Sequence, residues 1–201
     1  MTMALPAAPA PSPRRQVLVA TAVASSAATM LMAGMLAMWL RFRAAAPTRL
    51  SSDGLYQIKD WMPKSVQIPE VAANTMLVGM FIVPLMAQWA VYAAKRRDGQ
   101  HRSLALIICF AMGIAIVNAQ VAVYAQMEIA VADGAFQSMF YAITGVMVVL
   151  IVVGMAFSLV TFFRSVGGRE GDAQIVSAHA MYWYFITAAF TAMWFVVYVQ
   201  K

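Results

Sequence analysis

Long uncharged segments alternate with short charged ones along the whole chain. Five segments contain no Asp, Glu, Lys or Arg, and each has at least 24 residues: 17–40, 71–94, 103–127, 135–163 and 173–200. An α-helix rises about 1.5 Å per residue, so even the shortest segment spans about 36 Å, more than the roughly 30 Å hydrocarbon core of a bilayer. The pattern predicts an all-α polytopic bundle of five transmembrane helices, folded as one domain over residues 17–200.

Residues 1–16 differ from this pattern. They are rich in Ala and Pro and end near Arg14 and Arg15, which predicts a disordered N-terminal tail. The two arginines ahead of an apolar segment resemble a secretory signal. An apolar segment of 24 residues is longer than the roughly 7–15 residues of such a signal, so we expect a retained transmembrane helix.

The distribution of Lys and Arg between the two sides of the membrane predicts the orientation. Eight of the fourteen lie in the N-terminal tail and in the loops at 95–102 and 164–172, and six lie on the opposite side. The loop at 128–134 has no basic residue. By the positive-inside rule, we expect the N-terminus inside and the C-terminus outside.

Composition excludes several classes of protein. Hydrophobic residues make up 63% of the 201, charged residues 11%, and the mean hydropathy is +0.74, which excludes a soluble globular domain. The single cysteine, Cys109, excludes a disulfide framework and a multi-cysteine metal site. The net charge of +6 is spread over nearly every loop, so it predicts contact with anionic lipid rather than with nucleic acid.

The five apolar segments hold few groups that could carry chemistry. All eight acidic residues lie outside them, and a charge at mid-bilayer costs about 2.5–3.5 kcal/mol, so we expect no proton or ion path through this chain. His101 lies in a loop and His179 in the fifth segment, at different depths, which excludes a bis-histidine haem. We expect His179 to be a hydrogen-bonded packing residue or to contact a lipid head group or partner subunit. We predict no catalytic, cofactor-binding or metal-binding residue.

The second segment contains a proline. Proline lacks the backbone N–H that a helix interior needs, so Pro84 predicts a kink and one carbonyl without its helical partner. We expect Gln88 or a partner to satisfy that carbonyl.

Three motifs follow one another in and between the last two apolar segments. They are an F-Y-x-x-T-G pattern within 136–145, a basic inner loop after 162–164, and a closing aromatic helix at 178–185 and 194–198. Weaker matches lie in the first three segments. This ordered set, which covers residues 17–200, resembles subunit III of the haem–copper cytochrome c oxidases, in its compact five-helix bacterial form.

The chain departs from this family pattern at its ionisable positions. The family has acidic residues or histidines at five places where this chain has uncharged residues: Ala27, Val123, Met147, Leu150 and Tyr184. These replacements argue against a direct part in proton handling, and a divergent relative that serves a different complex is an alternative.

The resemblance implies a non-catalytic subunit of a respiratory oxidase in the bacterial plasma membrane. It implies that oxidase subunits I and II are the partners, that they carry the haem and copper, and that this chain binds phospholipid and supports proton uptake and turnover in aerobic electron transport. The alternatives are an accessory subunit of a nitric oxide reductase or another haem–copper complex, and a stand-alone membrane transporter. The expected residues for subunit packing or lipid contact are Gln120, Tyr124, Thr144, Gly145, His179, Tyr182, Trp183 and Phe185.

Overall fold

The structure is a computed structural model that describes residues 15–51, 53–63, 66–168 and 173–200. All five of its long helices are long and apolar enough to cross a membrane, which confirms the predicted all-α bundle. The elements in chain order are α1 (Gln16–Ala45), β1 (Thr48–Leu50), β2 (Gln57–Lys59), α2 (Glu70–Lys95), α3 (Gly99–Met127), the 3-10 turn η1 (Val131–Asp133), α4 (Ala135–Val166), α5 (Ala173–Met193) and the π-helical turn η2 (Trp194–Val199).

The helices extend beyond the uncharged segments that predicted them. Helix α1 continues through charged residues to Ala45, and α3 begins at Gly99, four residues before the uncharged segment 103–127. Charged side chains at helix ends reach water. Hydropathy therefore identifies the part of each helix inside the bilayer, but not the residues at which the helix begins and ends. Residues 1–14 of the predicted tail lie outside the described residues, and Gln16, expected in that tail, is the first residue of α1.

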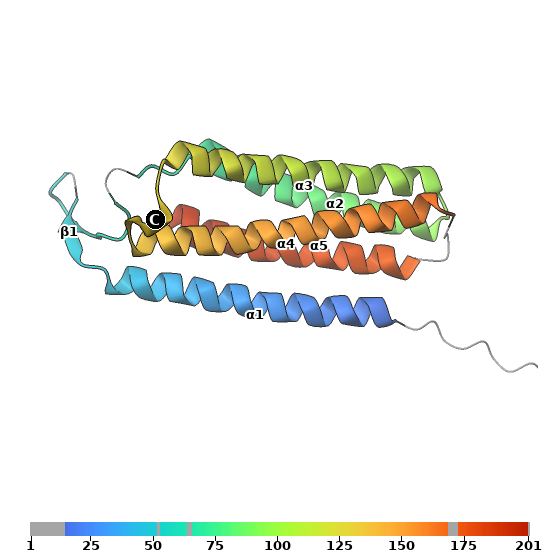
Figure 1. Cartoon of the computed structure of the whole chain (residues 1–201), viewed down its shortest axis with the longest axis horizontal. Helices are drawn as coiled ribbons and strands as arrows, with labels where there is room; N and C mark the ends of the chain where they lie inside the picture. The colour runs from blue at the N-terminus through green and yellow to red at the C-terminus, as the bar shows by residue number, and fades with distance from the viewer. Residues whose placement is uncertain (1–14, 52, 64–65, 169–172, 201) are drawn as a thin grey trace, which may run out of the picture.

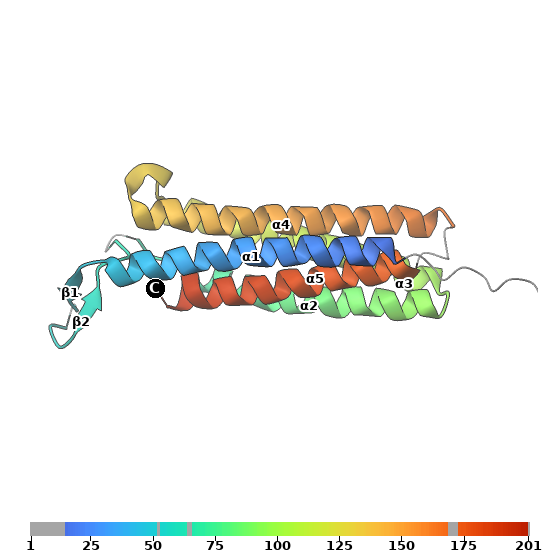
Figure 2. The same cartoon turned by 90° about the horizontal axis from the view of Figure 1, so that it is seen from below.

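Helices α2 to α5 pack as one group, and α1 lies along its side against α5 and part of α4 (Figures 1 and 2). Helix α1 buries few residues. The buried ones are Ser25, Met32 and Trp39, spaced seven residues apart, which forms one narrow seam along the helix. The rest of the α1 surface is thus left largely exposed.

A short antiparallel hairpin that the hydropathy pattern did not predict follows α1. Strands β1 and β2 pair with Arg49 opposite Ile58, and the Nε of Arg49 lies 2.9 Å from a carboxylate oxygen of Asp60. The Nζ of Lys59 donates to the carbonyls of Ala44 and Ala46 at 2.9 and 3.2 Å. A cation at a helix C-terminus stabilises carbonyls that have no helical partner, so the hairpin closes the end of α1.

The carbonyl that Pro84 leaves without its helical partner is satisfied from α5. Helix α2 runs through Pro84, which cannot donate to the carbonyl of Met80 one turn earlier. The Oγ1 of Thr187 lies 3.0 Å from that carbonyl and 2.9 Å from the carbonyl of Trp183, so its single proton is shared between them. Of the two expected sources, Gln88 does not fill this role, and a residue of the neighbouring helix α5 does. Gln88 instead accepts a hydrogen bond from Tyr184 at 3.3 Å, and it stands about 12 Å along α2 from Met80, too far for its side chain to reach that carbonyl.

We expect Thr187→Val to lower the free energy of unfolding by about 1–2 kcal/mol, because it removes the interhelical donor and leaves the Met80 carbonyl unsatisfied. The loss should shrink in a Pro84→Ala background, where residue 84 regains an N–H for Met80. Unfolding in a denaturing detergent titration measures both. Thr191→Val is the matched control, since Thr191 donates to the Thr187 carbonyl within its own helix. If Thr187→Val lowered the free energy of unfolding equally with and without Pro84, the hydrogen bond of Thr187 would not compensate for the proline.

Candidate functional site

Four of the predicted residues belong to one polar layer between α3, α4 and η2. The Oγ1 of Thr144 donates to the carbonyl of Phe140 at 2.6 Å, so the hydroxyl of Tyr124, 2.7 Å away, is the donor to Thr144. In the same layer, the hydroxyl of Tyr198 donates to Oε1 of Gln120 at 2.9 Å. These two bonds connect α3 to α4 and to η2. Gly145 follows Thr144, and a Cβ there would meet no atom within 4 Å.

A second layer lies nearer the opposite end of the bundle, between α4 and α5. The Nε1 of Trp183 donates to Nε2 of His179 at 3.0 Å. The Oγ of Ser158 lies 2.7 Å from that Nε2 of His179 and 3.2 Å from the Nε1 of Trp183. All three side chains are fully buried. The Nδ1 of His179 has no hydrogen-bond partner among the described residues. His179 is therefore packed inside this chain.

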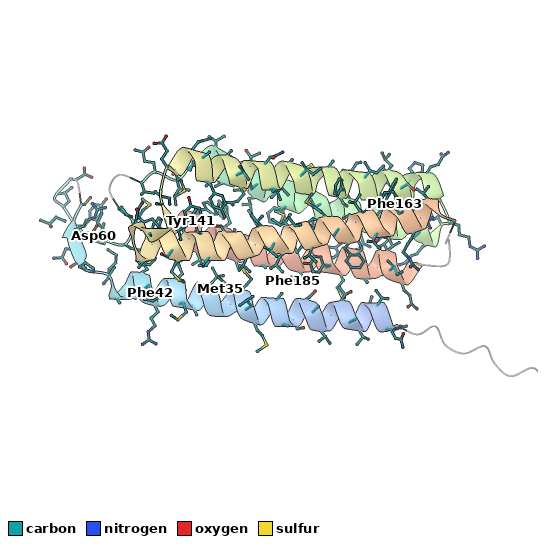
Figure 3. The ribbon with its side chains drawn as sticks, viewed as in Figure 1. Met35, Phe42, Asp60, Tyr141, Phe163 and Phe185 are labelled. Atoms are coloured by element: carbon teal, nitrogen blue, oxygen red, sulfur yellow. The ribbon has the colours of Figure 1, made fainter. Side chains whose placement is uncertain are left out.

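The last two predicted residues lie on α5 near this layer. The hydroxyl of Tyr182 donates to the carbonyl of Leu150 on α4 at 3.0 Å, and its ring lies 5.9 Å from the ring of Phe185. Phe185 is partly buried, between α1 and the rest of the bundle in Figure 3. The structure thus gathers the eight residues into two layers within the chain. Contact of their half-buried members, Tyr124, Gly145 and Phe185, with a partner stays a prediction.

Sequence reasoning missed Ser158, which completes the second layer, and the burial of Arg102 outside both layers. Ser158 joins His179 to Trp183, and its only signal is one small polar residue in an apolar segment. Arg102 is 3% exposed, although it stands in a charged loop sequence, and its Nε donates to Oγ of Ser165 at 2.5 Å. Within the described residues, no three His, Cys, Asp or Glu side chains gather to hold a metal ion. That this chain binds no cofactor stays a prediction.

The two ends of the bundle differ in charge. The start of α1, the α2–α3 turn and the end of α4 lie at one end, and the hairpin, the α3–α4 connection and the C-terminus lie at the other (Figure 1). Among the described residues the first end has six basic residues and one acidic residue: Arg15, Lys95, Arg96, Arg97, Arg102 and Arg164 against Asp98. The second has four basic and five acidic: Arg41, Arg43, Arg49 and Lys59 with Asp53, Asp60, Glu70, Glu128 and Asp133.

Comparison with known proteins agrees with this architecture. The family model described as cytochrome c oxidase subunit III matches residues 59–201. Among similar proteins are probable cytochrome c oxidase subunit 3 of Rickettsia conorii, 24% identical over 73% of this chain and 55% of the relative, and that of Rickettsia felis, 25% identical over 73% and 56%.

A third relative is cytochrome c oxidase subunit 3 of Tragelaphus imberbis, 28% identical over 56% of this chain and 42% of the relative. The chain spans about half the length of the curated relatives it matches. The family model covers well over half of this chain and includes α2 to α5, which form the packed group and both polar layers. The chain is a multi-pass membrane protein and belongs to the cytochrome c oxidase subunit III family.

Proposed function

We propose that this chain is the non-catalytic subunit III of a respiratory haem–copper cytochrome c oxidase in a bacterial plasma membrane. In this proposal it packs against subunits I and II, which hold the haem and copper, binds phospholipid, and supports proton uptake and sustained turnover. The match to the subunit III family over residues 59–201 is the observation that carries the proposal. The two Rickettsia relatives support the bacterial membrane.

The interior of the bundle supports a structural role within such a complex. Its buried side chains are mostly apolar, and the polar ones in the two layers are neutral residues that bond to neighbouring helices, as Tyr124 does to Thr144. Interhelical hydrogen bonds of this kind fix helices against one another. A rigid bundle with an exposed apolar surface suits a subunit that packs beside a catalytic one.

The charge difference between the two ends supports the proposed orientation. The basic end carries the α2–α3 turn and the start of α1, so the positive-inside rule favours the cytoplasmic side for it. The N-terminal end of α1 would then face inward and the C-terminus outward.

Purification of the tagged chain from its native membrane tests the partnership. We expect mild detergent extraction to yield a haem spectrum together with stoichiometric subunits I and II, because the apolar helix faces should remain packed in the complex. The measurement is an absorption spectrum and a subunit analysis of one sample. A folded, colourless chain without partners would overturn the proposal. Haem without a copper-binding subunit would overturn it in favour of a nitric oxide reductase.

A further inference from the structure

A hollow of about 460 Å³ opens where α2 turns into α3. Its lining residues lie at the end of α2 and the start of α3, and Figure 1 shows the turn between these helices at the basic end of the bundle. We name this hollow the α2–α3 corner pocket, and its lining residues are Trp89, Tyr92, Ala93, Arg96, Asp98 and His101. Two interfacial aromatic side chains and an arginine thus share one small cavity at the depth where head groups lie.

The electrostatics of the corner pocket favour an anion. Arg96 is exposed and makes no ion pair within the described part of the chain, and Lys95 and Arg97 flank it. The single acidic residue, Asp98, is already engaged: one carboxylate oxygen accepts the His101 backbone N–H at 3.1 Å, and the other lies 2.6 Å from Nδ1 of that histidine. The backbone hydrogen bond from His101 holds the pKa of the Asp98 carboxyl below its usual range.

An apolar stripe leads from the pocket into the membrane. From Arg96, steps of three or four residues reach Tyr92, Trp89, Leu85, Ile82 and Val78, so these side chains share one face of α2. Leu85 and Val78 are 63% and 61% exposed. From Tyr92 to Val78 the stripe is about 21 Å long, enough to cover one leaflet of roughly 15 Å.

We infer that the α2–α3 corner pocket binds the phosphate group of an anionic phospholipid, whose acyl chains lie along the Val78–Tyr92 stripe. Arg96 donates to the phosphate, and Trp89, which lies 5.8 Å from the His101 ring, forms the wall where the head group meets the chains. A free phosphate ion would account for the exposed Arg96 but not for the exposed apolar stripe that continues from it. The inference rests on the lipid-binding part of the proposed function and is independent of the oxidase partnership.

Lipid retention by the purified full chain tests the inference. The delipidated chain is mixed with micelles that contain phosphatidylglycerol or phosphatidylcholine, and native mass spectrometry counts the bound lipids. We expect phosphatidylglycerol to be preferred, and Arg96→Gln to reduce its retention about fivefold, as for one basic residue at a membrane surface. Arg15→Gln, which removes the same charge at the same end of the bundle, is the matched control.

Two further measurements distinguish lipid binding from binding of a free anion and from an effect of misfolding. Leu85→Asn interrupts the stripe without touching Arg96, and we expect it to lower phosphatidylglycerol retention while the melting temperature of the chain stays near that of the parent. Millimolar inorganic phosphate should not displace the lipid. Equal retention in Arg96→Gln and Arg15→Gln, or full displacement by phosphate alone, would overturn the inference. Neither result bears on whether haem subunits co-purify, so the two proposals fail separately.

Discussion

Trp39→Ala should lower the free energy of unfolding by about 3–5 kcal/mol, the range for removing a large buried aromatic side chain. Trp39 is fully buried, and its ring lies 5.2 Å from that of Trp61 and 5.3 Å from that of Phe136. It is one of three buried residues of α1, so its removal takes away most of the apolar contact at that end of the seam. A detergent unfolding titration followed by circular dichroism measures the loss.

Two substitutions make this prediction specific. Met38→Ala alters the neighbouring residue, which is 46% exposed, and should change the free energy of unfolding by no more than about 0.5 kcal/mol. Trp39→Phe should restore much of the loss, because the Nε1 of Trp39 has no hydrogen-bond partner among the described residues and the phenyl ring keeps part of the contact. If Met38→Ala and Trp39→Ala cost the same, Trp39 does not anchor α1.

The same cluster extends to the hairpin end of α1. Phe42 stacks on Trp61 with ring centroids 6.4 Å apart, and Figure 3 shows Phe42 near the end of α1, beside the hairpin that carries Asp60. The loop between α1 and α2 therefore contributes an aromatic side chain to the core. This explains how a helix with so narrow a buried seam is held at its C-terminal end.

Hydropathy predicted the number and type of helices because the thickness of a bilayer imposes one length on every span. It did not predict the hairpin, whose strands have three residues each and alternate between exposed and half-buried positions. The positions of the helix ends were also missed, since caps such as Asp98 lie among charged residues that hydropathy assigns to loops.

Pairings between helices were the least predictable part of the site. The sequence identified Tyr124, Thr144, His179 and Trp183 as notable, yet only the structure shows that the first two bond to each other. Which side chains meet depends on how each helix is rotated about its axis, and the α4 pattern is apolar all round. For the same reason, only the structure shows that Thr187 reaches the carbonyl that Pro84 leaves without its partner.

Gly154→Ala should destabilise the fold by about 1–3 kcal/mol, although alanine favours a helix over glycine. An added Cβ would lie 3.0 Å from Cζ2 of Trp183 and 3.1 Å from Cδ1 of Ile186. The indole cannot move away without loosening its Nε1 bonds to His179 and Ser158. Gly145→Ala on the same helix is the control, because a Cβ there meets no atom within 4 Å, and it should stabilise by about 0.5–1 kcal/mol.

Coupling between Gly154 and Trp183 distinguishes this steric cause from a general effect on α4. Trp183→Phe removes the ring edge that carries Cζ2 and Cη2, the two indole atoms nearest the added methyl group. Gly154→Ala should therefore cost less in the Trp183→Phe background than in the parent, and a double-mutant cycle of unfolding free energies measures the difference. Additive effects would mean that the indole yields to the methyl group at no cost, and the hydrogen-bonded layer around His179 would then not fix the distance between α4 and α5.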